Sequence, residues 1–359
     1  MSGAWRTATL GELCDIYQPK TITAKEMVTD GPYLVYGANG VIGRHDSFNH
    51  ADEELVMGCR GSVGALHFSK PKSWITGNAM VIRPKVSGVD RRFVFYALQG
   101  GVDLSSTISG ASQPQITRKS LAPTKIPFPP LPEQQRIVGI LDQAFEGIAK
   151  AKANAVRNLA NAKELCRSEF SSILREAKGW RNFTLPDISK NLDGKRIPIT
   201  RSDRVAGEIP YYGASGIVDY VEGFIFDDEI LLVSEDGANL LARSTPIAFS
   251  VQGKCWINNH AHVLKFEDMI VQRYVERFIN HITIEQFVTG AAQPKLTQAS
   301  LNKIPILMPT DIAETAKIAD RLDELSDLAF SLQENAKART KHLESLQAAI
   351  LEQAFSGNL

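Results

Sequence analysis

The feature that constrains this chain most is an internal repeat, because a repeat sets how many similar folding units a chain contains. The segment WRTATL at 5–10 returns as WRNFTL at 180–185, and YGANG at 36–40 returns as YGASG at 212–216. Three more segments return in the same order. WI and NA within 74–79 return as WI and HA within 256–261. GASQPQIT at 110–117 returns as GAAQPKLT at 290–297, and KIP at 125–127 returns as KIP at 303–305. The sequence therefore predicts two related halves.

Each half opens with a segment of mixed composition, residues 1–132 (module one) and residues 179–313 (module two). Both segments are rich in glycine, proline, aromatic and β-branched residues. Short apolar runs that lie between turn signals predict strands, and longer amphipathic runs predict a few helices. Strands are expected at 79–82 and 229–233, and helices at 91–98 and 272–282. Both modules are therefore expected to be mixed α/β structures.

The second part of each half, residues 133–178 and 314–359, has the composition of a long helix. Residues 133–178 contain no proline, and residues 314–355 contain neither glycine nor proline. Apolar or small side chains recur at helical spacing, in the first helix at Ile137, Leu141, Ala144, Ile148, Ala151, Ala155, Leu159, Ala162, Cys166, Phe170 and Ile173, and in the second at Ile318, Leu322, Leu325, Ala329, Leu332, Ala336, Leu343, Leu346 and Ile350. The second set alternates steps of four and three, with Arg339 in its one gap, which is typical of a coiled-coil seam.

A helix of this length spans about 65 Å, and alone it would leave its apolar stripe in water. The two stripes can cover each other in an antiparallel coiled coil; the alternative is that each helix packs only on its own module. Pairing predicts an α+β fold in which a long two-helix coiled coil separates two mixed α/β modules in a pseudo-two-fold repeat. Two related modules held apart in opposite orientations suit a bipartite DNA site with two different halves.

Three sequence elements resemble the specificity subunit of type I restriction–modification enzymes. They are Trp5 followed by LGEL at 10–13, the two GxxQPxI/LT segments, and PPLPEQQRI at 129–137 at the start of a long helix; the second copy of this last element, 309–318, lacks the PLPEQ string. The resemblance covers the whole chain. It implies two target-recognition domains (1–132 and 179–313) and two spacer helices (133–178 and 314–359).

The resemblance also implies partners and a cellular setting. It implies double-stranded DNA as a ligand and a complex with two methyltransferase subunits, which carry S-adenosylmethionine and methylate adenine. Restriction subunits with ATP-dependent translocase and nuclease activity would join that complex, and this chain itself would hold no cofactor. A cytoplasmic location is expected, because no secretory signal and no apolar run long enough to span a membrane is visible.

Motifs for catalysis are missing from the sequence, so we expect a non-catalytic chain. An adenine methyltransferase needs an [NDS]PP[YFW] motif, whereas the only PP pair lies in FPPL at 128–131, and no phosphate-binding GxxxxGK[ST] loop is present. The four cysteines, Cys14, Cys59, Cys166 and Cys255, are far apart and are expected to be buried thiols. His260 and His262 share one face of a predicted strand, but no third ligand has a telling spacing, so we expect structural or DNA-contacting histidines and no metal.

Charge separates the two modules. The chain is neutral overall, but residues 1–132 hold 14 basic and 10 acidic side chains, whereas residues 179–313 hold 13 and 16. Arginine and lysine pair with guanine edges, asparagine and glutamine with adenine, and other cations hold phosphates. The candidate DNA contacts of module one are Lys20, Lys25, Arg44, Arg60, Ser62, Lys70, Lys72 and Asn78. Those of module two are Lys190, Lys195, Arg196, Arg201, Ser215, Asn239, Arg243 and His260.

Arg60 is the strongest single candidate, because it lies between two glycines that let backbone and side chain approach a groove. The alternative for each of these residues is an exposed side chain that only solubilises the protein. The Gln113–Pro114 and Gln293–Pro294 pairs are expected to fix the junction between module and helix, or else to contact DNA. Gln134, Gln135 and Arg136, at the start of the first helix, are candidates for a protein interface.

Three other functions fit the same sequence features. The chain could be the specificity subunit of a related modification or phage-defence system, an enzyme of its own such as a nuclease, or a coiled-coil scaffold that binds only proteins. Methylation or cleavage of DNA by the isolated chain would favour the enzyme. Absence of sequence-selective binding in a gel shift with a partner methyltransferase would favour the scaffold.

If the paired helices set the distance between two half-sites, their length should control the DNA spacer. Inserting or deleting one helical turn in both helices is expected to change the spacer length and to leave both half-sites unchanged. Mapping methylated adenines in genomes that carry each variant measures both quantities. A variant with an unchanged spacer would contradict the idea that the helices act as a ruler.

Overall fold

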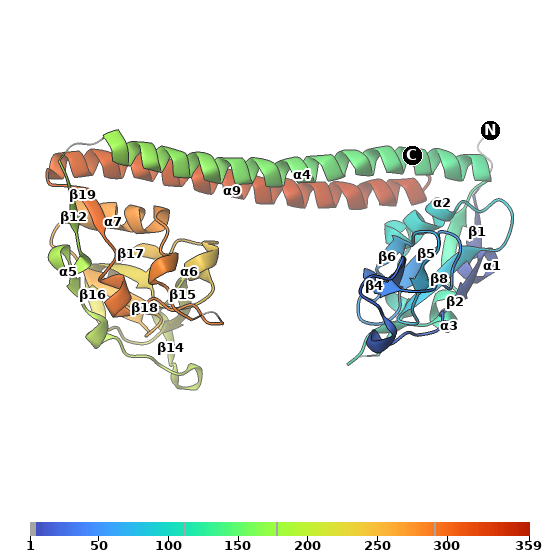
Figure 1. Ribbon diagram of the computed structural model, residues 1–359, viewed down its shortest axis with the longest axis horizontal. Coiled ribbons are helices and arrows are strands. Elements are labelled where there is room, and N and C mark those ends of the chain that lie inside the picture. The colour runs from blue at the N-terminus through green and yellow to red at the C-terminus, as the bar shows by residue number, and fades with distance from the viewer. Residues whose placement is uncertain (1–4, 111, 177–178, 291) are drawn as a thin grey trace. The chain divides into compact units, whose positions relative to one another are not determined.

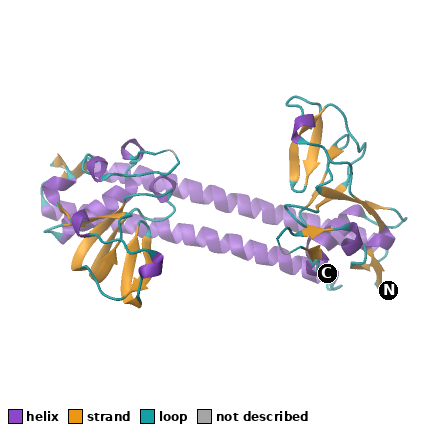
Figure 2. Cartoon of the chain, turned by 90° about the horizontal axis from the view of Figure 1, so that it is seen from below, coloured by secondary structure: helices purple, strands orange, loops and turns teal. Residues whose placement is uncertain are grey.

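The computed structural model describes residues 5–110, 112–176, 179–290 and 292–359. The chain divides into two compact units: Met1–Ala155 with Ala338–Leu359, and Val156–Lys337. Each unit contains one module together with one part of each long helix. Strands gather in the modules, whereas the two long segments are helical throughout (Figure 2).

Module one contains two sheets and two small strand pairs (Figure 1). The four-stranded sheet has the order β2 (Cys14–Tyr17), β8 (Ala79–Pro84), β5 (Leu55–Gly58) and β6 (Leu66–Phe68), and the three-stranded sheet has the order β4 (Gly40–His45), β3 (Tyr33–Gly37) and β7 (Trp74–Ile75). The pairs are β1 (Arg6–Thr9) with β11 (Lys125–Phe128), and β9 (Ile108–Ser109) with β10 (Gln115–Ile116). The helices are α1 (Leu10–Leu13), α2 (Arg91–Tyr96) and α3 (Arg118–Leu121), with short helical turns η1 (Ala24–Glu26), η2 (Ala97–Gly101) and η3 (Ser105–Thr107).

Module two merges the corresponding strands into one sheet of six. Their order is β13 (Lys190–Asn191), β18 (Ala261–Lys265), β16 (Phe226–Ser234), β17 (Ala248–Ile257), β14 (Ala206–Gly213) and β15 (Gly216–Val221), and β12 (Trp180–Phe183) pairs separately with β19 (Ile306–Pro309). The helices are α5 (Leu185–Ile188), α6 (Asn239–Ala242), α7 (Met269–His281) and α8 (Gln298–Leu301), with turns η4 (Asp193–Lys195), η5 (Arg201–Asp203) and η6 (Glu285–Phe287).

The two modules share one strand topology. Strand β3 pairs in parallel with β7, with Tyr36 opposite Ile75, and β14 pairs in parallel with β17, with Tyr212 opposite Ile257. Strand β17 is continuous where module one has the two separate strands β6 and β7. The predicted repeat of mixed α/β modules is therefore confirmed, and the difference in sheet count comes from this one interruption.

The repeated opening of each half forms a strand, a helix cap and one helical turn. In module one, the Thr9 backbone N–H donates to Glu12 Oε2 at 2.6 Å, and the Glu12 N–H donates to Thr9 Oγ1 at 3.3 Å. In module two, the Thr184 N–H donates to Asp187 Oδ2 at 2.7 Å. Threonine followed three residues later by an acid satisfies free N–H groups at a helix start, so the same local sequence folds in the same way twice.

The long helices are α4 (Leu131–Glu176) and α9 (Ile312–Phe355), and they run antiparallel. In the first unit, Lys152 Nζ lies 3.8 Å from Glu344 Oε1. In the second unit, Arg321 forms ion pairs with Glu169 and Glu176 on α4. The predicted pairing is confirmed by these contacts. The expected end of the first helix, at residues 177–178, lies outside the described residues.

The predicted stripe of α4 is buried or half-buried at every position. On α9 the prediction fails near the C-terminus, because Leu346 is 48% exposed and Leu351 and Ala354 are buried instead. A helix with 3.6 residues per turn drifts away from a strict 3.5-residue repeat, so the inward face moves to later positions over several turns.

Each module packs its core against one part of the helix pair. In the first unit, Ile137 and Leu141 of α4 and Leu351 and Phe355 of α9 join the core of module one. Helix α2 lies between sheet and helix pair (Figure 1), and its Phe93 ring packs 5.1 Å from that of Phe355. A Cβ at Gly101 would overlap the Phe355 ring, so the close approach requires glycine there.

In the second unit, α7 has the corresponding place between sheet and helix pair (Figure 1). Phe170 of α4 packs against Phe278 of α7, with ring centroids 6.0 Å apart, and Ile318 and Leu322 of α9 complete the core. Among the helices of the described ranges, none has an apolar stretch that could cross a membrane.

Gln134 ties module one to the start of α4. Its side chain is fully buried, its Nε2 donates to the carbonyls of Gly88 (3.0 Å) and Pro129 (2.8 Å), and its Oε1 accepts from the N–H of Asp90 (2.8 Å). Asp90 in turn caps the N-terminus of α2. This candidate interface residue therefore lies inside the module–helix junction, whereas Gln135 is exposed and Arg136, also exposed, pairs with Glu133 and the Leu359 carbonyl.

Replacing Gln134 by alanine should destabilise the protein, because three backbone groups, those of Gly88, Asp90 and Pro129, would lose their buried side-chain partner. We expect the free energy of unfolding to fall by about 2 kcal/mol, measured by urea denaturation. Gln135→Ala, at the exposed neighbouring position, is the matched control and should change it by less than about 0.5 kcal/mol. Equal effects of the two substitutions would contradict the assigned role of Gln134.

Candidate nucleic-acid interface

Four segments of module one meet at one edge, which we call loop edge one: the β3–β4 turn, the loop 59–64 after β5, residues 76–78 before β8, and segment 113–117. The N–H groups of Cys59 and Arg60 donate to the Asn78 carbonyl at 3.0 and 3.3 Å, and the Ile116 N–H donates to the Cys59 carbonyl at 3.1 Å. At Gly58, a Cβ would collide with the carbonyls of Ala38 and Ser62, so glycine permits this convergence.

Three of the sequence-predicted residues come together at loop edge one. Arg60, Ser62 and Asn78 are exposed, and within the described residues their side chains have no hydrogen bond or ion pair. Gly61, which follows Arg60, adopts φ +77° and turns the backbone sharply after it. The result is a donor-rich group of polar side chains on two short segments, 59–64 and 76–78, which backbone hydrogen bonds join.

Module two builds the same edge, loop edge two, with the same backbone contacts. The Glu235 N–H donates to the His260 carbonyl at 2.8 Å, and the Leu296 N–H donates to the Glu235 carbonyl at 2.7 Å. The predicted residues Ser215 and His260 lie here and are exposed. Ser234 takes the place of Gly58, and its hydroxyl donates to the Ala214 carbonyl of the β14–β15 turn.

The layer beneath the two edges differs in charge. Strand registers place Met57 opposite Met80 in module one and Val233 opposite His262 in module two, which makes Met80 and His262 equivalent. The neutral set Gln18, Cys59 and Met80 in module one thus corresponds to the charged set Asp193, Glu235 and His262 in module two. In module one, Gln18 Nε2 donates to Cys59 Sγ at 3.0 Å.

His262 is the centre of a buried ion network in module two. Its side chain is 1% exposed, its Nε2 lies 2.8 Å from the Leu296 carbonyl, and its Nδ1 lies 2.6 Å from Asp193 Oδ2. Both ring nitrogens therefore face oxygen acceptors, one a carbonyl and the other a carboxylate. The network therefore anchors segment 293–297 through the Leu296 carbonyl.

Two further cations balance the carboxylates of this network. Arg196 Nη1 lies 2.6 Å from Glu235 Oε2, and Lys295 Nζ lies 3.1 Å from Glu235 Oε1. Burial raises the pKa of Asp193, but the hydrogen bond and charge of His262, the Val263 N–H and the charge of Arg196 together outweigh it and hold this pKa below its ordinary value. Burial likewise raises the pKa of Glu235, and Arg196 and His262 outweigh it.

Asp193, Glu235 and His262 have the residue types and the spacing of a cation site, with ligand atoms within 4.8 Å of one another. Both nitrogens of His262 are already hydrogen-bonded, and Arg196 and Lys295 already supply positive charge. A metal would have to displace these contacts. The arrangement is therefore that of an internal ion network, which makes His262 a structural histidine.

Two side chains of module two that were predicted to contact DNA form hydrogen bonds with backbone groups of the module instead. Arg243 donates from its guanidinium to the carbonyls of Ile279, Asn280 and Ile282, and burial lowers its pKa. Asn239 Oδ1 accepts from the N–H groups of Ser244 and Thr245. These side chains and that of Arg196 are engaged inside the module.

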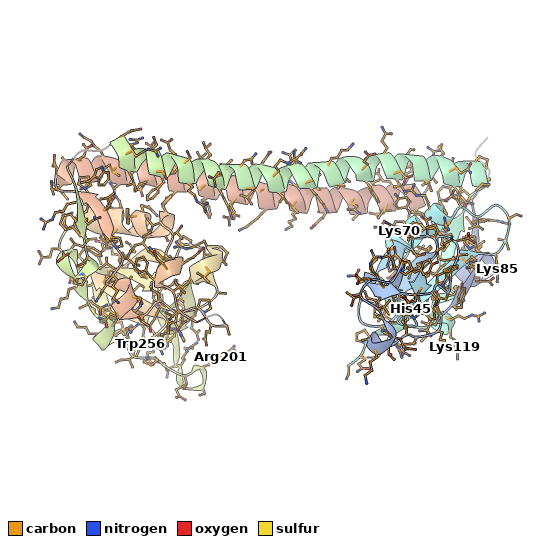
Figure 3. The ribbon with its side chains drawn as sticks, viewed as in Figure 1. His45, Lys70, Lys85, Lys119, Arg201 and Trp256 are labelled. Atoms are coloured by element: carbon orange, nitrogen blue, oxygen red, sulfur yellow. The ribbon has the colours of Figure 1, made fainter. Side chains whose placement is uncertain are left out.

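The remaining predicted cations are exposed and spread over several elements. Lys190 lies on the edge strand β13, Lys195 in η4 and Arg201 in η5. Figure 3 shows Arg201 at the same end of module two as Trp256. In module one, Lys70 and Lys72 lie in the β6–β7 loop, and Arg44 lies on β4. Lys20 and Lys25 lie between β2 and β3.

Sequence reasoning missed an aliphatic pair on the hairpin beside each loop edge. Both hairpins contain a β-bulge at the same place, where Ile42 and Val218 are the extra residues. Ile42 is 50% and Val218 55% exposed, and their neighbours Val41 and Ile217 are also exposed. The signal was present in the repeat itself, since two β-branched or aliphatic residues follow the YGAxG turn in both copies. Such groups can contact thymine methyls.

The four cysteines are buried and free, as predicted. Burial raises the pKa of Cys14 to about 12 and that of Cys255 to about 11, so these thiols stay protonated at neutral pH.

Comparison with known proteins identifies relatives of the whole chain. The profile of the family described as type I restriction modification DNA specificity domain matches residues 3–158 and 177–341. A protein of Haemophilus influenzae named as a type I restriction enzyme specificity subunit is 36% identical over 147 residues, which are 40% of this chain and 37% of that protein. The EcoDI specificity subunit of Escherichia coli is 20% identical over 99% of this chain and 88% of its own length.

A solved structure concerned with complex assembly and conformational transition of the type I R–M system contains a chain with the same fold. It superposes with a TM-score of 0.75 at 16% identity, covering 99% of this chain and 98% of that one. The match to the Haemophilus protein, by contrast, spans little more than a third of its length.

Removing the Asp193 carboxylate should destabilise the protein by breaking the ion network around His262. Asp193→Ala is expected to lower the free energy of unfolding by about 3 kcal/mol at pH 7, because it leaves His262 buried beside one remaining carboxylate. Since the pKa of Asp193 is depressed in the folded state, its contribution is complete above the ordinary aspartate range (about 3.9) and is lost as pH falls through the folded value.

Urea denaturation at pH 7 and at about pH 3 should therefore give a smaller difference between wild type and Asp193→Ala at the lower pH. The exposed Asp227→Ala is the matched control in the same module and should have little effect at either pH. A difference that stays constant over this range would contradict the electrostatic role of Asp193.

Proposed function

The chain belongs to the type I restriction–modification DNA specificity family, and from this premise we propose that each module reads one half of a bipartite DNA site. As a specificity subunit it is the DNA-recognition component of its system. We further propose that the loop edge of each module faces DNA. The loop edges are the best candidates, because they combine anchored backbone with exposed polar side chains. Within the described residues, the side chains of Arg60, Ser62 and Asn78 have no hydrogen bond or ion pair.

The observation that carries this proposal is the duplication of the edge on one scaffold with different side chains. Loop edge one presents Arg60, Ser62 and Asn78, whereas loop edge two presents Ser215 and His260. The shared backbone places Asn78 and His260 at equivalent positions, directly before β8 and β18, and unequal side chains pair with different base edges. The proposal therefore includes two half-sites of different sequence.

We assign Arg60 to guanine, because a free guanidinium can donate to O6 and N7 of that base together. Asn78 can pair with adenine, and the aliphatic pairs on the bulged hairpins can contact thymine methyls. Exposed cations away from the edges, such as Lys70, Lys72 and Arg201, would contact phosphates and add affinity without selectivity.

Methyl transfer and cleavage are proposed to reside in partner subunits. Two methyltransferase subunits would supply S-adenosylmethionine, and restriction subunits would supply translocation and nuclease activity; this chain would supply recognition only. The exposed faces of α4 and α9, which include Gln135 and Arg136, are a candidate surface for those subunits.

A gel shift with the full chain co-purified with its methyltransferase tests this function. The complex is expected to bind one bipartite duplex in preference to random duplexes. Binding without preference would favour a scaffold, and methylation or cleavage by the chain alone would contradict a purely recognising role.

Arg60→Ala should weaken binding to the preferred duplex by about 1–3 kcal/mol and relax selectivity at a guanine of one half-site. The matched control is Lys85→Ala, because Lys85 follows β8 at the end opposite Asn78. The control should leave selectivity unchanged, and any loss of affinity should be equal for all sequences. Unchanged selectivity in Arg60→Ala would remove Arg60 from the reading surface.

A further inference from the structure

Two pairs of positions are equivalent in the loop edges but carry different chemistry. Arg60 and Asp236 both form an antiparallel bridge with the QPx segment, to Gln115 and Lys295 respectively. Asn78 and His260 both directly precede an equivalent strand, β8 or β18. Module one thus has an Arg–Asn pair where module two has an Asp–His pair.

The backbone presents both pairs in the same way. Arg60 and Asp236 are each followed by a glycine with positive φ, Gly61 at +77° and Gly237 at +106°. Residues with side chains rarely adopt this conformation, so the turn depends on glycine and leaves the preceding residue at the edge. The carbonyl of Asn78 or His260 accepts an N–H from the residue before Arg60 or Asp236, which holds the two members of each pair side by side.

In module two, Asp236 holds the His260 ring in one orientation. His260 Nδ1 lies 2.9 Å from both carboxylate oxygens of Asp236, so Nδ1 carries the hydrogen of this contact. The His260 side chain is 49% exposed, whereas that of Asp236 is 17% exposed. Within the described residues, His260 Nε2 has no hydrogen-bond partner. The half-buried acid therefore fixes a ring whose other nitrogen is free.

We propose that these equivalent pairs are the base-reading pairs of the two modules, and that Asp236 is the positioning residue for His260. This inference rests on the proposed function and specifies its residues. Arg60 donates two hydrogen bonds to guanine, and Asn78 can accept from and donate to adenine. With Nδ1–H bonded to Asp236, Nε2 of a neutral His260 offers a lone pair to the exocyclic amino group of cytosine or adenine.

The pairs are exchangeable in principle because the backbone beneath them is shared. Asp236→Arg combined with His260→Asn gives module two the pair of module one. The reciprocal variant combines Arg60→Asp with Asn78→His. Because the side chains of Arg60 and Asn78 make no hydrogen bond or ion pair within the described part of module one, the reciprocal variant is the safer one for folding.

The probe is a library of random-sequence DNA duplexes, from which the full chain in complex with its methyltransferase selects a preferred site. The wild type should select two different half-sites. Each exchange variant is expected to change the preferred base at its own module's half-site and to leave the other half-site unchanged. Affinity for the original duplex should fall by about 10-fold to 100-fold.

Single variants separate positioning from reading. Asp236→Ala should lose selectivity at one base position of the second half-site, by about 10-fold or more, while Asp236→Asn, which keeps an acceptor for Nδ1–H, should restore most of it. A thermal melt of each variant checks folding. A purely structural role of Asp236 would lower the melting temperature and would not move the base preference.

Two results would overturn the inference: both exchange variants select the wild-type site, or affinity falls equally for all duplexes. Selection of no preferred site by the wild type would instead overturn the proposed function itself. The failure of the inference and the failure of the function are therefore distinguishable in one set of selections.

Discussion

The pairing of the first and last strands of each module is the constraint on which the rest of the structure depends. In module two, β12 follows α4, pairs antiparallel with β19, and β19 leads into α9. The end of α4 and the start of α9 are thereby brought together, so the helices must leave the module in opposite chain directions. In module one, β1 pairs with β11 directly before α4 begins. Each module is thus closed at the point where it joins the helices.

Because each module joins the helix pair where its first and last strands meet, the apolar stripe of a long helix packs against two neighbours. Near each module, the stripe of a long helix covers both the partner helix and the module core, as Ile137 and Phe170 of α4 do. The helices α2 and α7 fill the space between sheet and helix pair and supply aromatic contacts to the long helices. Module and helix pair share one core in each unit, and Gln134 adds the polar link at the start of α4.

The ion network of module two involves some of the acidic side chains of this module. By composition this module is acidic, which counts against DNA binding. Yet Asp193 and Glu235 are largely buried and balanced by His262, Arg196 and Lys295. These carboxylates anchor loop edge two from inside the module and add little negative charge to its outer surface. Module one anchors the equivalent edge with the neutral pair Gln18 and Cys59. Net charge of a segment is therefore a poor guide to the surface that it presents.

Periodicity and repetition alone determined the two modules, the two long helices and nearly all of their buried stripe, because these patterns are local and hold wherever a helix or strand meets a core. Only the tertiary structure decided that Leu346 faces solvent, that Gln134, Arg196 and Arg243 are engaged inside, and that Asp236 holds His260. The partners of these side chains come from distant segments, such as Glu235 for Arg196 and Ile279 for Arg243, and strand pairing brings them together. Residue type predicted a polar, cationic DNA-binding surface. Which side chains are available to contact bases depends on contacts between segments that are distant in the sequence.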